Sequence, residues 1–157
     1  MSDINERIIP LDELDDFEVA EGDPDVRGWH VFSSDGQRVG EVDELLVDTT
    51  DLKVRYLDVD LDNAVSVEGE EDRHILIPIG YARLDEIDDH ILVDTLDIAT
   101  LSALPPYAQE PLTRAYELSV LQRFDPKAVK PTEADPYATD VYDESRFYGS
   151  RRKRTTG

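Results

Sequence analysis

Acidic side chains alternate along residues 58–62 in a way that resembles the first half of a calcium-binding loop. Asp58, Asp60 and Asp62 stand at every second position, where an EF-hand loop places oxygen ligands for Ca²⁺. That loop also needs glycine at its sixth position and glutamate at its twelfth. Asn63 and Gly69 stand there instead, so the sequence does not predict a calcium site.

The three histidines, His30, His74 and His90, lack the spacing of a zinc site. Zinc needs three or four converging ligands, and the chain has no cysteine to supply one. His74 and His90 are expected at the beginnings of strands, where a polar surface residue is ordinary. We therefore expect neither a metal nor another cofactor.

Motifs for covalent or phosphate chemistry are absent from the sequence. The lack of cysteine excludes thiol catalysis and thiolate zinc. There is no glycine-rich phosphate loop and no G-x-S-x-G nucleophile elbow. With 37 acidic residues in the chain, neighbouring carboxylates are too common to indicate an acid–base pair. We expect a protein that is not an enzyme.

The formal net charge of -21 argues against nucleic acid as a partner, because phosphate binding depends on clustered lysine and arginine. One basic cluster, Arg151, Arg152, Lys153 and Arg154, follows the acidic part of the chain. Such a tail binds an anionic membrane weakly, at about 1 kcal/mol per charge. No apolar run approaches the roughly 18 residues of a membrane span. We expect a cytoplasmic protein with a solvated tail; a peripheral position at the inner face of the cell membrane is the alternative.

Short β-rich runs separated by turn signals predict a mainly β domain. Asp35-Gly36 is a hairpin signal, and Thr49-Thr50-Asp51 is a second break. From Leu57 to Asp62 apolar and acidic residues alternate, which predicts a strand with one face in the core and one in water. Pro78 should lie at a strand end, an edge or a bulge. Strands at spacings of about 10–15 residues indicate a small closed or sandwiched β-domain.

The chain divides by composition into four parts: an acidic leader (1–22), the β-domain (23–104), a helical extension (105–125) and a tail with a basic end (126–157). A short helix capped by Asp or Thr is expected from about residue 95. A longer helix is expected over residues 111–124, because Leu112, Tyr116 and Val120 lie four apart. The tail has recurring prolines and no periodic apolar face, so we expect it to be disordered alone.

Five short motifs follow one another between Asp23 and Ala82. They are Asp23-Pro24-Asp25-Val26-Arg27-Gly28-Trp29, Asp35-Gly36-x-x-Val39-Gly40-x-Val42, Leu45-Leu46-Val47-Asp48, Val54-Arg55-Tyr56-Leu57 and Leu76-Ile77-Pro78-Ile79-Gly80-Tyr81-Ala82. In this order and spacing they resemble the PRC-barrel family, named for the cytoplasmic domain of the photosynthetic reaction-centre H subunit. The resemblance covers about residues 23–104. It implies a small, strongly bent β-barrel with one or two short C-terminal helices and flexible termini, which binds macromolecules rather than performing chemistry.

The candidate interaction residues lie at one turn of this domain and in the tail. Asp48 and Arg55 flank the turn, where an ion pair would fix the strand register. In the H subunit, the region that matches Asp48, Asp51 and Arg55 faces the secondary-quinone side and its proton-uptake route. The resemblance therefore marks these residues, with Tyr56, as a surface interaction cluster. The basic residues 151–154 complete the candidate set.

These observations favour a non-enzymatic protein-interaction or scaffold module with a stress-associated role. The sequence does not name its protein partner, and exposed strand edges favour a homodimer. The alternative is a peripheral accessory of a photosynthetic or electron-transfer membrane complex, similar to the H subunit, with the basic tail near anionic lipid. A second alternative is a small barrel that binds a ligand or a metal.

Overall fold

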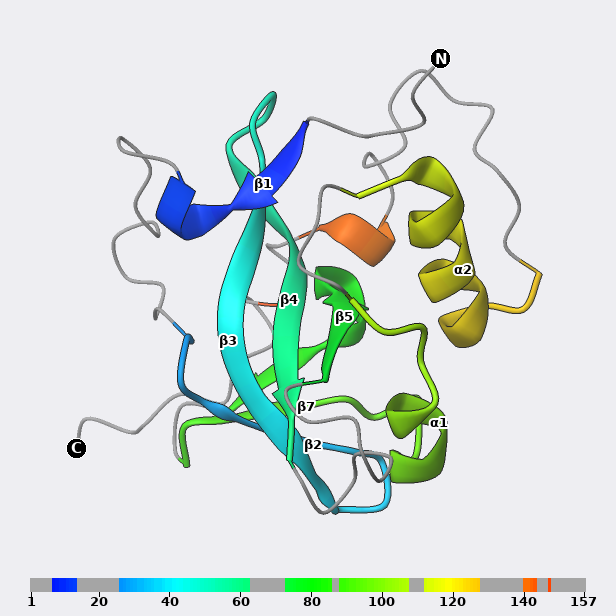
Figure 1. The fold of residues 1–157 in the computed structure, drawn as a ribbon. Coiled ribbons are helices and arrows are strands. Elements are labelled where there is room, and N and C mark those ends of the chain that lie inside the picture. The colour runs from blue at the N-terminus through cyan, green and yellow to red at the C-terminus, as the bar shows by residue number, and fades with distance from the viewer. Residues whose placement is uncertain are drawn as a thin grey trace.

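The fold was obtained as a computed structural model (Figure 1). It describes residues 7–13, 26–62, 73–85, 88–107, 112–127, 140–143 and 147. The basic residues 151–154 and most of the predicted acidic leader lie outside these ranges. Residues 7–13 of that leader are described, and they join the sheet through the strand Ile8–Pro10.

A mixed sheet of seven strands forms the body of the protein, which confirms the mainly β prediction. Six strands follow the order β5-β4-β3-β2-β7-β6, and β1 pairs with β3 beside this path. Neighbours run antiparallel except for the parallel pair of β2 and β7. Within the described residues, hydrogen bonds do not close the sheet into a barrel. The strands are β1 (Ile8–Pro10), β2 (His30–Phe32), β3 (Arg38–Asp48), β4 (Lys53–Leu61), β5 (His74–Pro78), β6 (Arg83–Asp85) and β7 (His90–Leu92).

β3 and β4 are the long central pair, and β3 curves visibly along its length (Figure 1). Their pairing contains two irregularities, between Val42 and Glu44 and between Leu46 and Val47. Bulges of this kind bend a strand and increase its twist. The predicted hairpin turn is also present, because Gly36 has φ +74° and its amide donates to the Ser33 carbonyl at 3.0 Å. β5 ends at Pro78, as the sequence predicted.

Buried side chains form two apolar clusters. The larger one contains inward residues of the sheet such as Val42, Leu45 and Leu57. The second cluster lies around Tyr56 and includes side chains from beyond the sheet: Ile8, Leu46, Tyr56, Leu76, Tyr107, Leu112 and Tyr142. Because this second cluster also covers β4, the prediction of a strand with one face in water was wrong. Asp58, on the face expected to be wet, is only 2% exposed.

Within the described ranges, the sheet is accompanied by two α-helices and three short 3-10 helices. Helix α1 (Ile98–Ser102) begins at the N-cap Asp97, whose carboxylate accepts from the Thr100 amide. Helix α2 (Arg114–Phe124) begins three residues after the predicted start at residue 111, and the Thr113 side chain caps it by accepting from the Tyr116 amide. The 3-10 helices are η1 (Leu11–Glu13), η2 (Ile79–Tyr81) and η3 (Asp140–Tyr142). None of the helices described here is long and apolar enough to cross a membrane.

Two described residues of the predicted disordered tail belong to the packed domain. Tyr142, in η3, is buried in the second cluster, and Phe147 is fully buried in the larger one. Most of the tail lies outside the described residues, so its predicted disorder stays a prediction. The aromatic residues of this segment do not form a periodic apolar face, so the sequence pattern did not predict that Tyr142 and Phe147 are buried.

Candidate functional site

Four charged side chains meet at the turn between β3 and β4, and we call them the turn cluster: Arg7, Asp48, Asp51 and Arg55. One terminal nitrogen of Arg55 lies 2.9 Å from both Asp48 Oδ2 and Asp51 Oδ2. Arg7, which precedes β1, donates to Asp48 Oδ2 at 2.6 Å and to Asp51 Oδ2 at 3.1 Å. The predicted ion pair of Asp48 and Arg55 is therefore present, and Arg7 is a second cation bound to the same two carboxylates.

The turn cluster is not the surface cluster expected from the sequence. The side chains of Asp48 and Arg55 are 0% and 5% exposed, whereas that of Asp51 is 40% exposed. Burial alone would raise the pKa of Asp48, but hydrogen bonds from Arg7, Thr50 and Arg55 outweigh it and lower that pKa. Asp48 is thus held as a carboxylate inside the domain, and Asp51 is the cluster member most accessible to a partner.

The same carboxylate organises the backbone of the turn. Asp48 Oδ1 accepts from the amides of Thr50 at 2.9 Å and Asp51 at 3.3 Å. The Leu52 amide donates to the Asp48 carbonyl at 2.7 Å. Leu52 takes φ +54°, which is uncommon for a residue with a side chain. Its side chain is 57% exposed and points outward from an ordered turn.

Tyr56 belongs to a different group, the tyrosine network, which consists of Tyr56, Glu117 and Tyr142. The Tyr56 hydroxyl donates to Glu117 Oε1 at 3.0 Å and lies 3.1 Å from the Tyr142 hydroxyl. Burial raises the pKa of Tyr142 to about 12. Arg55 also donates to the Tyr142 backbone carbonyl at 2.7 Å. The tyrosine network therefore joins β4, α2 and η3, and Arg55 links it to the turn cluster.

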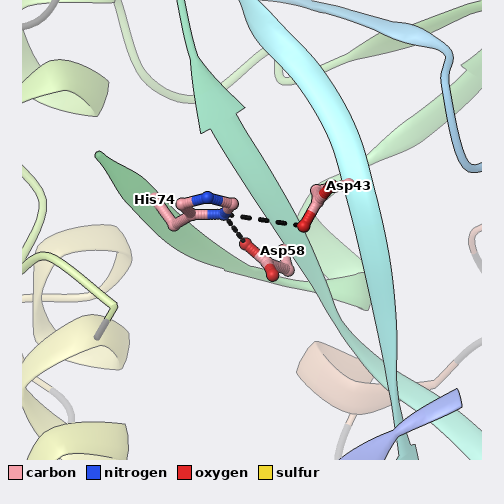
Figure 2. Close-up of side chains that lie close together, drawn as sticks. All are labelled: Asp43, Asp58 and His74. Atoms are coloured by element: carbon pink, nitrogen blue, oxygen red, sulfur yellow. Dashed lines mark hydrogen bonds and ion pairs between the residues drawn. The ribbon is translucent and has the colours of Figure 1, made fainter. Parts of the chain in front are cut away.

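Three strands bring Asp43, Asp58 and His74 together, a set we call the histidine–carboxylate group (Figure 2). His74 Nδ1 lies 2.7 Å from Asp58 Oδ1 and 4.0 Å from Asp43 Oδ2. His74 is buried, which corrects the prediction of an ordinary polar surface residue. Asp43 is half exposed and opens the group to solvent.

The other two histidines lie elsewhere in the sheet. His30 on β2 and His90 on β7 are register partners, and their rings stack with centroids 6.4 Å apart. β3 and β4 separate β2 from β5, where His74 begins the strand. The three histidines therefore lie at two separate places in the sheet. This agrees with their sequence spacing, which did not predict a shared site.

Sequence reasoning missed several members of these groups. Arg7 carried a weak signal, as a single basic residue in an otherwise acidic N-terminal segment. Tyr142 also carried a weak signal, as one of four aromatic residues in the tail, whereas Glu117 carried none. Their contacts join segments far apart in the chain. The basic cluster 151–154 lies outside the described residues, so its predicted role stays a prediction.

The curved sheet, with its bulged central pair and two apolar clusters, defines a small, mainly β domain. Its candidate polar groups hold the β3–β4 turn and the terminal segments in place. A family model described as PRC-barrel domain matches residues 18–97, about half of the chain. The protein belongs to this family, as its sequence motifs indicated.

Proposed function

We propose that the protein is a non-enzymatic protein-interaction module whose docking point is the β3–β4 turn. The observation that supports this proposal is Leu52. Among the described residues it is the large hydrophobic side chain left exposed, at 57%. Non-glycine residues with positive φ are strained and concentrate at functional positions, and Leu52 has this conformation.

The surroundings of Leu52 favour docking with little rearrangement. Asp48 is tied to Arg7 and Arg55, and its carboxylate accepts two amides of the turn. A turn held in this way loses little conformational entropy on binding, which improves affinity. The partner would offer an apolar pocket for Leu52, with a basic group at its rim opposite the half-exposed carboxylate of Asp51.

A photo-crosslinking residue placed at position 52 of the full chain tests this proposal. Specific adducts with an identified partner are expected from position 52 and not from position 94. Asp94 is a suitable control site because its side chain is 58% exposed and it lies in another turn, before α1. Equal crosslinking from both positions, or none from position 52, would contradict the proposal.

Leu52→Gly separates docking from folding. Glycine accepts positive φ without strain, so the free energy of unfolding should be retained while partner binding is lost. Leu52→Gly with full binding would exclude the turn as the docking point.

A second copy of the chain is one occupant to test, because β5 and β6 end the sheet path and edge strands promote pairing. Tyr107 bridges His74 at the edge of β5. Sedimentation equilibrium at high micromolar concentration would show a dimer. A dimer that persists in Leu52→Gly would place self-association at an edge rather than at the turn. A monomer at all concentrations would exclude the homodimer.

The basic cluster 151–154 supports one other proposal, a peripheral membrane role. Its charges are attracted to anionic lipid, although the net charge of -21 opposes the approach. Co-sedimentation with anionic liposomes that is lost on deletion of residues 146–157 would support this role. Failure of the intact chain to co-sediment would exclude it. The stress-associated role has no structural correlate among the described residues.

A further inference from the structure

We infer that Asp43, Asp58 and His74 form a binding site for a divalent transition-metal cation such as Zn²⁺. One ligand atom from each residue can be chosen so that all three lie within 4.8 Å of one another. The side chains come from β3, β4 and β5, and they point toward a common position (Figure 2). An imidazole with two carboxylates is a donor set that suits zinc.

A break in strand pairing gives this site its shape. Val42 pairs with Val59 and Glu44 pairs with Asp58, so Asp43 is the extra residue between two ladder positions. A bulge re-aims the side chain of its extra residue, and bulges are frequent next to functional sites. Here the bulge turns Asp43 on β3 toward His74 on β5, and β4 lies between these two strands (Figure 2).

The electrostatic surroundings favour a cation. Asp58 is 2% exposed, and its register partner on β3 is a further acidic residue, Glu44. The carboxylates of Asp58 and Asp43 lie 2.7 Å and 4.0 Å from one imidazole nitrogen, so negative charge is concentrated around it. Arg27 forms an ion pair with Glu44 at 3.5 Å and balances the charge of that carboxylate.

The distances require only small side-chain movements to accept a metal. Zinc lies about 2.0–2.2 Å from nitrogen and oxygen ligands, which sets tetrahedral donors about 3.3–3.5 Å apart. His74 Nδ1 and Asp58 Oδ1 are 2.7 Å apart, and Nδ1 is 4.0 Å from Asp43 Oδ2. The first pair must open and the second must close, each by less than about 1 Å. The carboxylate oxygens of Asp43 and Asp58 lie within 4.8 Å of each other and must close by at most about 1.5 Å. Asp43 is half exposed, so it provides the entry path and leaves room for water as a fourth ligand.

Titration of the untagged full-length protein with Zn²⁺ by calorimetry tests the inference. We expect one zinc ion per chain, and no heat from Mg²⁺ at the same concentration, since Mg²⁺ prefers an oxygen shell. Asp43→Asn and His74→Gln should each weaken zinc binding by about 10-fold or more. Asp43→Asn is the cleaner variant, because Asp43 is exposed and its loss leaves the buried pair of Asp58 and His74 intact.

Two matched controls decide between this site and other sources of binding. Glu41→Gln removes one exposed charge from the same strand, and His90→Gln removes a histidine of the stacked pair. Both should bind zinc as the unmodified protein does. A flat zinc titration would overturn the inference. So would equal weakening by Glu41→Gln and Asp43→Asn, or binding that depends on His90 but not on Asp43.

Discussion

Arg55 and Asp48 form an ion pair of 2.9 Å across the β3–β4 hairpin, with both side chains withdrawn from solvent. Removing two charges from water costs free energy, and a buried ion pair is stable only when its remaining donors and acceptors are also hydrogen-bonded. This condition is met, because Asp48 also binds Arg7 and the Thr50 amide, and Arg55 binds the Tyr142 carbonyl. One pair thus connects the N-terminal segment, the central hairpin and the segment at residue 142.

Asp48→Asn should therefore destabilise the fold strongly. The substitution leaves two arginines at the turn without their central carboxylate, and we expect a loss of about 3 kcal/mol in the free energy of unfolding. Urea denaturation measures it. Asp94→Asn is the matched control, since its ion pair with Arg83 is exposed and should contribute less than about 1 kcal/mol. Equal losses in both variants would contradict the assigned importance of the buried pair.

The pKa of Asp48 predicts how stability depends on acid. Its folded pKa is lowered from the ordinary value of 3.8, because the hydrogen bonds it accepts outweigh the effect of burial. The stabilisation is fully present above the unfolded value and is lost as the pH falls through the folded pKa. The stability gap between the unmodified protein and Asp48→Asn should therefore narrow as the pH falls below about 4. Unfolding curves between pH 6 and 2 test this, and a constant gap would refute it.

The turns on either side of β3 were predictable because their signals are local in the sequence. Asp35-Gly36 and the break at residues 49–51 specify turns by residue type, and both turns are present. The ion pair of Asp48 and Arg55 was also predictable, since the two residues flank one such turn. Local signals place residues that are close in sequence, and these two turns account for the pairings of β2 with β3 and of β3 with β4.

What the sequence did not indicate depends on contacts between distant segments. The period-two pattern from Leu57 to Asp62 is correct for a strand, but it cannot show that another layer covers the second face. That layer comes from Tyr107, Leu112 and Tyr142. Likewise the bulge at Asp43 depends on the pairing of β3 with β4, so His74 could not be matched with its carboxylates from spacing alone.

The tyrosine network should make the protein sensitive to alkali. Burial raises the pKa of Tyr142 from its ordinary 10.0 to about 12. Because the folded protein retains this proton more strongly than the unfolded chain, stability should fall as the pH rises above about 10. Thermal unfolding at pH 9 and pH 11 tests the direction, and Tyr142→Phe should reduce the difference. A protein equally stable at both pH values would contradict the burial of this phenol.

Gly40 should tolerate no side chain, for a reason that differs from that at Gly36. A Cβ at Gly40 would collide with the backbone carbonyl of Asp60 on β4, and overpacking of this kind costs about 1–3 kcal/mol. Gly36 faces open space but has φ +74°, so Gly36→Ala should cost about 1–2 kcal/mol through backbone strain. Gly36→Asn should recover part of that loss, since asparagine tolerates this conformation. Gly40→Asn should have no higher free energy of unfolding than Gly40→Ala, because both introduce the same Cβ. Chemical denaturation of the four variants tests the distinction.

Phe147 is the residue that decides whether the C-terminal segment belongs to the folded domain. Its side chain is fully buried in the larger apolar cluster, although no periodic apolar pattern surrounds it in the sequence. Phe147→Ala should lower the free energy of unfolding by about 3–5 kcal/mol, as for other large buried side chains. The exposed Leu52→Ala, by comparison, should change it by about 0.5 kcal/mol or less. If Phe147→Ala is as stable as the unmodified protein, the segment does not contribute to the core. The expected loss would mean that the domain's core includes a side chain far beyond the 18–97 family match.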